Sequence, residues 1–204
     1  MKNVKIYSIV AFFFLAFFVS GCAILKTLEN VKRLKFRQNG ITNIQLDGIS
    51  LKGKNRIEDF SALEGLKFVQ AFSNKKMPVK FVINIDVENP NNGKGGYPRT
   101  DLTLNSFPWR LIIDGNEIVT GNIEKPVFVP GVGETTAFPI AVEIDLYHFF
   151  GSNGYKEVID LALRLAGSSG KPVDVKLVAH PVIGTPLGDL SYPGEITVVQ
   201  KEFN

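Results

Sequence analysis

The chain has 204 residues, a formal net charge of +3 and a single cysteine. A composition that is 45% hydrophobic and 21% charged excludes a disordered chain, and the length allows one domain with a substantial core. One cysteine excludes an internal disulfide and a thiolate zinc cluster, and two histidines leave little for a histidine-rich metal site.

The chain begins with its most apolar segment. Residues 1–21 carry Lys2 and Lys5 but no acidic residue, and 15 of these 21 residues are hydrophobic. The apolar run of residues 6–19 is shorter than the roughly 20 residues that a membrane-spanning helix needs. A basic start, a short apolar core and small residues at its end are typical of a secretory signal. We therefore predict a signal peptide at residues 1–21, and the length argues against the alternative, an N-terminal anchor helix.

The sequence Val19-Ser20-Gly21-Cys22 resembles the lipobox of bacterial lipoproteins. Small residues ahead of the cysteine let the chain lie extended in a protease site, and the thiol is the nucleophile that accepts the lipid. The resemblance implies signal cleavage between Gly21 and Cys22 and a diacylglycerol on Cys22, which anchors the mature chain to the bilayer. The alternative is a chance cysteine after an apolar run.

The residue after the cysteine indicates in which membrane the lipoprotein would be anchored. Ala23 stands where an aspartate would resemble the inner-membrane retention signal of many Gram-negative bacteria. The resemblance therefore implies a lipoprotein of the outer membrane that faces the periplasm, provided that the host is Gram-negative.

Basic residues are concentrated just after the cysteine. Residues 22–40 have a net charge of +4, whereas residues 41–204 have a net charge of −3. We interpret residues 22–40 as a lipidated basic tether, which either touches anionic head groups, at about 1 kcal/mol per charge, or lies in solvent as a linker or short helix. The mildly acidic remainder of an exported chain argues against nucleic acid as a partner.

Residues 41–204 are predicted to form one mainly β domain. Alternation of apolar and polar residues predicts about seven or eight strands and an antiparallel sandwich. Asp114-Gly115 predicts a tight hairpin turn, and Pro139 predicts an edge strand or a bulge. The strands are expected at residues 44–51 (with Gly48 as a bulge), 79–87, 102–104, 109–113, 116–119, 138–144, 173–179 and 196–198.

Two segments have helical rather than strand periodicity. Residues 155–166 place apolar side chains at helical spacing, and Gly167 is suited to cap that helix. Residues 57–72 predict a second helix, which we expect to pack on a sheet through Leu63, Leu66, Phe68, Val69 and Phe72.

Residues 81–145 resemble the late-embryogenesis-abundant (LEA) type 2 family, also called the water-stress and hypersensitive-response domain. The resemblance rests on a strand that leads into Asn89-Pro90-Asn91, a strand pair around residues 109–116, the step Thr120-Gly121, and a turn at residues 129–133. The chain departs from the family pattern by the insertion of residues 92–98 and by the helix predicted at residues 155–166. The resemblance implies a compact sandwich like fibronectin type III and immunoglobulin domains, an association with desiccation stress, and no known catalysis.

The Asn89-Pro90-Asn91 motif itself has a conformational explanation. Proline fixes φ near −65°, and asparagines bond to their own backbone and tolerate strained angles. We therefore interpret the motif as a structural turn and not as a binding site.

The remaining candidate chemistry is sparse. His148 and His180 lack partners at metal-ligand spacing, and residues 93–96 lack the spacing of a phosphate-binding loop. Asp86 and Glu88 lie on one face of a predicted strand. Cation binding by the two carboxylates is one interpretation, and a solvated polar face is the one we expect. The aromatic residues 147–150 would line an apolar groove, although we expect them to form the core at a strand end. The sequence thus predicts no catalytic residues, metal or cofactor.

These observations predict a non-enzymatic envelope lipoprotein with a LEA type 2-like domain, serving in stress and desiccation protection or in binding envelope components. Its partners would be the bilayer, through acylated Cys22, and an unknown envelope protein or apolar ligand. The alternative is a periplasmic carrier or scaffold for an apolar ligand or partner protein, with a pocket between the sheets beside Phe149 and Phe150. A hydrolase is a remote alternative. It would be recognised by a buried nucleophile within hydrogen-bond reach of a base.

Overall fold

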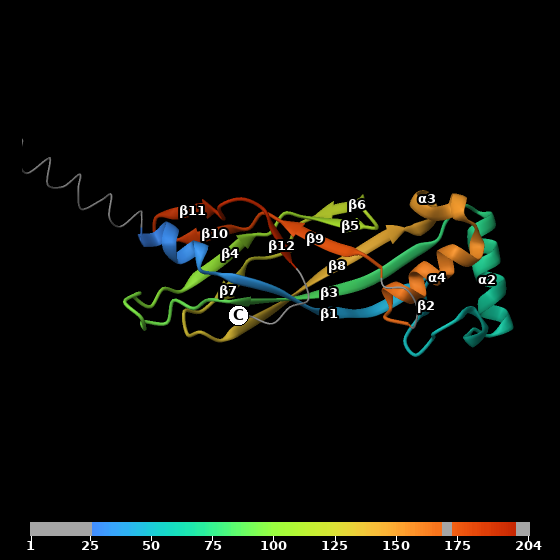
Figure 1. Ribbon diagram of the computed structural model, residues 1–204, viewed down its shortest axis with the longest axis horizontal. Helices are drawn as coiled ribbons and strands as arrows, with labels where there is room; N and C mark the ends of the chain where they lie inside the picture. The colour runs from blue at the N-terminus through green and yellow to red at the C-terminus, as the bar shows by residue number, and fades with distance from the viewer. Residues whose placement is uncertain (1–25, 169–172, 199–204) are drawn as a thin grey trace, which may run out of the picture.

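The computed structural model describes residues 26–168 and 173–198, which form an antiparallel β-sandwich with helices at one end (Figure 1). One layer is a long sheet with the strand order β2-β1-β3-β8. The other layer consists of two shorter sheets that lie end to end along it, with the orders β11-β10-β4-β7 and β12-β9-β5-β6. The prediction of a mainly β antiparallel sandwich is confirmed.

The strands of the long sheet are β1 (Lys35–Leu46), β2 (Ile49–Ser50), β3 (Pro78–Glu88) and β8 (Thr135–Asp145). Those of the shorter sheets are β4 (Leu102–Ser106), β5 (Trp109–Ile113), β6 (Asn116–Gly121), β7 (Val127–Val129), β9 (Val175–Ala179), β10 (Val182–Thr185), β11 (Gly188–Ser191) and β12 (Ile196–Val198). The described residues therefore contain 12 strands, more than the seven or eight expected. Short strands such as β7, β10 and β11 offer too few alternating positions to be recognised in the sequence.

Strand β3 is the centre of the sandwich because its alternation places one whole face in the core. Its inward-facing side chains are at most 3% exposed. It pairs with β8 without interruption from Pro78 opposite Asp145 to Glu88 opposite Thr135. Between the layers, the ring of Phe107 lies 5.5 Å from that of Phe36 on β1 and 5.3 Å from that of Phe138 on β8.

Two turn predictions and one edge prediction can be compared with the structure. Asp114 and Gly115 have φ of 47° and 82° and join β5 to β6 as a tight hairpin, as predicted. Pro139 lies in β8, an outer strand of the long sheet, where a missing N–H leaves the pairing with β3 intact, so the edge-strand prediction is confirmed. Gly48, predicted as a bulge, is instead the second residue of a similar Asp-Gly turn, with φ of 76°.

Regular structure begins earlier than residue 41, where we placed the start of the domain. Residues 26–32 are helical, and β1 begins at Lys35 and pairs with β3 along most of its length. Val31 and Leu34, which lie within the expected tether, are buried in the core. From residue 26 onward the basic segment is therefore part of the folded domain.

The helices gather at the end of the sandwich opposite residues 26–32 (Figure 1). They are η1 (Ile57–Asp59), α2 (Ala62–Ser73), α3 (Leu146–Phe150), η2 (Gly151–Asn153) and α4 (Tyr155–Leu165). The helix expected at residues 155–166 is confirmed, with Gly167 at φ 83° just beyond its end. The prediction that residues 147–150 end a strand is wrong, because the Asp145 carboxylate accepts a hydrogen bond of 3.0 Å from the Tyr147 N–H and so begins α3.

Helix α2 packs differently from the prediction. Phe68 and Ala71 are buried, and the Phe72 ring lies 5.0 Å from that of Tyr147 on α3 and 5.8 Å from that of Tyr155 on α4. Contacts with α3 and α4 thus hold the helix, and the other predicted packing residues, Leu63, Leu66 and Val69, are exposed.

Gly121, from the Thr120-Gly121 step of the family pattern, is required by the ring of Trp109. The two residues are cross-strand partners, and a Cβ at Gly121 would lie 2.4 Å from Cζ2 of Trp109. Strand β6 is the edge strand of its sheet, so the aromatic ring covers an edge glycine.

We predict that Gly121→Ala lowers the free energy of unfolding by about 1–3 kcal/mol, because the added methyl overpacks against the Trp109 ring. Gly65→Ala is the matched control: Gly65 lies inside α2, and a Cβ there meets nothing within 4 Å. The control should be neutral or more stable by up to about 1 kcal/mol. Urea unfolding of both variants measures the difference, and equal stabilities would show that the ring does not constrain position 121.

Candidate functional site

The predicted lipidation and cleavage residues, Cys22 and Gly21, lie outside the described residues. The first described residue, Lys26, is four positions after Cys22 in the sequence. Among the described residues, no helix combines the length and apolar character needed to cross a bilayer. The candidate site consists of the residues that contact the helix of residues 26–32.

The Asn89-Pro90-Asn91 motif directly follows β3, and both asparagines are fully buried. The Asn89 amide nitrogen donates to the carbonyls of Thr100 (2.9 Å) and Val129 (3.0 Å). Its amide oxygen accepts from the backbone N–H (3.2 Å) and the side-chain amide (2.8 Å) of Asn91. A buried carboxamide with all of these bonds made is a strong local constraint, because each broken bond would leave a buried polar group unpaired. We call Asn89 and Asn91 the asparagine node.

The asparagine node holds the N-terminal helix of residues 26–32. The Asn91 amide nitrogen donates to the Asn30 carbonyl (2.9 Å), and the Arg33 guanidinium donates to the Asn91 amide oxygen (3.0 Å). Asn30, which is 5% exposed, donates from its own amide to the Thr100 hydroxyl (3.0 Å). The motif thus docks a helix that lies about 60 residues earlier in the chain.

The insertion at residues 92–98 adds a second contact with this helix. The Tyr97 ring lies 3.6 Å from the Arg33 guanidinium carbon, a distance that gives a cation–π interaction. The Tyr97 hydroxyl donates to the Glu29 carboxylate (3.1 Å). The insertion, which departs from the family pattern, therefore contributes to helix docking in this chain.

A third contact comes from the C-terminal part of the chain. The Tyr192 hydroxyl donates to the carbonyl of Lys32 (3.2 Å), where the helix ends. Burial raises the pKa of the Tyr192 hydroxyl, which keeps it protonated and able to donate. The helix is thus fixed by two parts of the sequence, residues 89–100 and Tyr192.

The turn at residues 129–133 closes the asparagine node from the other side. Gly133 N–H donates to the Asn89 carbonyl (3.1 Å), and Gly131 N–H donates to the Asp101 carboxylate (2.8 Å). A Cβ at Gly131 would lie 2.5 Å from the carbonyl oxygens of both Asn91 and Thr100. Only glycine fits there without moving the backbone, which gives the Gly131 of the family pattern a physical reason.

The basic residues of the expected tether have different environments. Lys26 and Lys32 are exposed, as are Lys94 and Arg99 of the adjacent loop. Arg37 instead pairs with Asp86 (2.5 Å), a carboxylate that is only 3% exposed. The face of Asp86, which we expected to be solvated, is therefore closed by an ion pair at that position.

The other residues weighed in the sequence do not come together. His148 is exposed beside the Phe149 ring, and a His180 ring nitrogen lies 3.0 Å from the Tyr192 carbonyl. Within the described ranges, no group of three or more His, Cys, Asp or Glu side chains is placed to hold a metal ion.

An apolar groove of about 570 Å³ runs between the loop of residues 122–126 and the outer strand β8. Ile123, Pro126, Ala137, Pro139 and Ala141 contribute to its walls. Its volume falls within the range of small-molecule sites. It lies at the edge of the sandwich, and Phe149 and Phe150 do not line it, unlike the pocket expected for a carrier.

We predict that Asn89→Ala lowers the free energy of unfolding by about 2–4 kcal/mol, since it leaves several buried polar groups without partners. The matched control is Asn84→Ala on β3, where the side chain makes one exposed hydrogen bond, with Thr42. The control should cost less than about 1 kcal/mol. Equal losses for the two variants in urea unfolding would contradict a structural role for the asparagine node.

Comparisons with known proteins were made for the whole chain. No protein-family model matches it, and no curated protein sequence matches it. A crystal structure of a protein from Archaeoglobus fulgidus is similar over 62% of this chain and 88% of its own, with 12% identity and a TM-score of 0.33. A solution structure of a protein from Arabidopsis thaliana is similar over 83% of this chain and 86% of its own, with 16% identity and a TM-score of 0.35. Neither likeness is strong enough to assign a family or a function.

Proposed function

We propose that the protein is a non-enzymatic lipoprotein of the bacterial cell envelope, anchored through diacylglycerol on Cys22. The observation that carries this proposal is the lipobox-like Val19-Ser20-Gly21-Cys22, which contains the single cysteine of the chain and directly follows the apolar run. Two or three acyl chains suffice for stable attachment, since each buried methylene contributes about 0.8 kcal/mol.

The docked helix supports a defined geometry for this anchor. The four residues from Cys22 to Lys26 span at most about 14 Å when fully extended. Because contacts with Asn91 and Tyr97 hold the helix, the end of the sandwich that contains the asparagine node would lie close to the bilayer. Exposed Lys26, Lys32 and Lys94 at this end would each gain about 1 kcal/mol from anionic head groups.

We propose that the domain protects or binds envelope components under water stress. The support is the ordered resemblance of residues 81–145 to the LEA type 2 family, in which Gly121 and Gly131 have steric reasons in this fold. In a Gram-negative host, the anchored domain would face the periplasm from the outer membrane. A carrier for an apolar ligand is the second candidate, and the groove beside β8 is the observation that favours it.

We predict that Cys22→Ser abolishes incorporation of radiolabelled palmitate, because serine lacks the thiol that accepts the lipid. The signal peptide should then no longer be removed by the lipoprotein pathway. Ser20→Ala is a matched control, since it keeps a small residue and the thiol and should retain the label. Label retained on the Cys22→Ser protein would contradict the lipid anchor.

The stress role is tested in a bacterial strain that lacks the protein and in the same strain supplied with wild-type or Cys22→Ser protein. Survival after drying should fall in a strain that lacks the protein, and wild-type protein should restore it. The Cys22→Ser protein should fail to restore survival if protection requires the anchor. An unchanged survival curve on deletion would contradict the stress role while leaving the anchor intact.

A further inference from the structure

Helix α2 presents an apolar face to solvent. Leu63, Leu66 and Val69 are 66%, 67% and 49% exposed. Their spacing of three residues places them on one side of the helix, opposite the buried Phe68 and Ala71. Burying such side chains is favourable in water, so a face of this kind is typical of a surface that meets another apolar phase.

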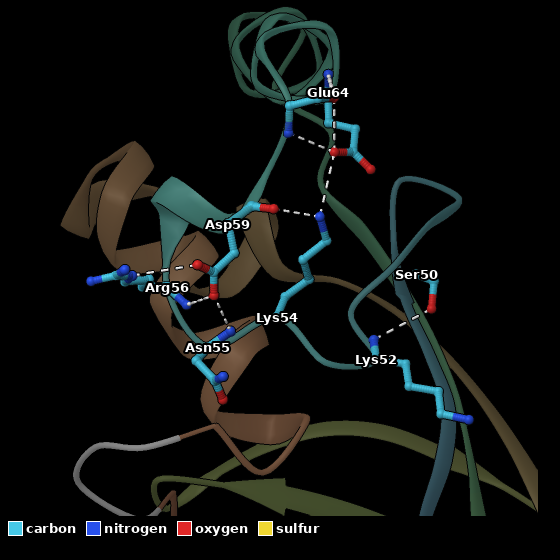
Figure 2. Close-up of polar contacts among 8 residues, drawn as sticks. Ser50, Lys52, Lys54, Asn55, Arg56, Asp59 and Glu64 are labelled. Atoms are coloured by element: carbon cyan, nitrogen blue, oxygen red, sulfur yellow. Dashed lines mark hydrogen bonds and ion pairs between the residues drawn. The ribbon is translucent and has the colours of Figure 1, made fainter.

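This face is held in position by a well-formed helix start. Ser61 and Glu64 form a capping box, in which the Ser61 N–H donates to the Glu64 carboxylate (2.7 Å) and the Glu64 N–H donates to the Ser61 hydroxyl (3.3 Å). Lys54 donates to the Asp59 carbonyl and lies 3.6 Å from the Glu64 carboxylate, as Figure 2 shows. The ring contact of Phe60 with Phe68, at 5.0 Å, fixes the same turn from inside. These contacts therefore hold the first turn of α2 in the orientation that exposes Leu63 and Leu66.

The segment that contains this face carries a net positive charge. Residues 52–76 contain six basic and three acidic residues, a net charge of +3. Two of the acidic residues serve the local structure: Asp59 accepts from the N–H groups of Asn55 and Arg56, and Glu64 caps α2. These backbone hydrogen bonds lower the pKa of both carboxyls, so both are ionised and engaged at neutral pH.

Three lysines on or directly after α2 are exposed. Lys67 lies on the helix, and Lys75 and Lys76 follow its end. Aliphatic side chains on one face of a helix, together with surrounding lysines, are the combination by which interfacial helices bind anionic lipids.

We propose that α2 docks in the interface of an anionic lipid bilayer, with Leu63, Leu66 and Val69 inserted and the lysines on the head groups. The exposed face of α2 has none of the Trp, Tyr and Arg residues that dominate protein–protein hot spots, which favours lipid over a protein partner. The inference does not depend on lipidation of Cys22. If the proposed anchor is present, α2 lies at the opposite end of the molecule and meets a second surface (Figure 1).

The test is flotation of the chain from residue 22, carrying Cys22→Ser, with phosphatidylcholine vesicles that contain or lack an equal part of phosphatidylglycerol. The described core lies within residues 31–198, so removal of residues 1–21 leaves it complete. We expect binding to the anionic vesicles that weakens in high salt. The triple variant Leu63→Ser, Leu66→Ser, Val69→Ser should lose at least about tenfold in partition coefficient.

A matched variant separates this face from other exposed apolar residues. Phe128→Ser with Leu187→Ser removes side chains that are 60% and 53% exposed elsewhere and should bind as the parent does. Circular dichroism melting confirms that each variant is folded. Absence of binding to anionic vesicles would overturn the proposal in favour of a protein partner. Equal binding by the parent and the α2 triple variant would overturn it in favour of the basic end around Lys26.

Discussion

The fully buried side chain of Asn89 is the constraint on which the N-terminal end of the sandwich depends. Its two donors and its acceptor join the end of β3 to Thr100, to Val129 at the end of β7, and to Asn91. A buried amide of this kind specifies one arrangement, because any shift of the chain would leave several polar groups unpaired at once. Asn91 then extends the constraint to Asn30, and so to the N-terminal helix.

The two ends of the sandwich are built by different physical means. At the asparagine node, hydrogen bonds and one cation–π contact hold a short basic helix. At the other end, aromatic contacts of Phe72 hold α2 with its aliphatic face outward. Between them, β3 and β8 pair without interruption over 11 residue pairs.

Much of the fold was predictable because its main elements are long and strongly periodic. The alternation in β3 and β8, the Asp114-Gly115 hairpin and the helical spacing of α4 each determine a local conformation within about ten residues. The apolar spacing of residues 57–72 also predicted a helix, which the structure divides into η1 and α2 because Ser61 caps the start of α2. It did not reveal which face is buried, because Leu63 and Phe68 look alike in sequence and only the positions of α3 and α4 decide between them.

The candidate site was less predictable because its contacts are long-range. Arg33 and Asn91 are 58 residues apart in the chain, and Asn30 and Thr100 are 70 apart. The excess of basic residues in residues 22–40 left head-group contact and a solvated linker or short helix both open. The apolar Val31 and Leu34, which the structure buries, were the available signal for a docked segment. The Asn89-Pro90-Asn91 motif has a local conformational explanation in the sequence, but its role in docking follows only from the tertiary structure.

The central claim is that the asparagine node and the N-terminal helix act as one unit, and a double-mutant cycle tests it most directly. The free energies of unfolding of Arg33→Ala, Asn91→Ala and the double variant give the coupling between the two side chains. The account predicts a favourable coupling of about 0.5–3 kcal/mol, as for residues within one hydrogen-bond network. Additive effects of the two substitutions would contradict it.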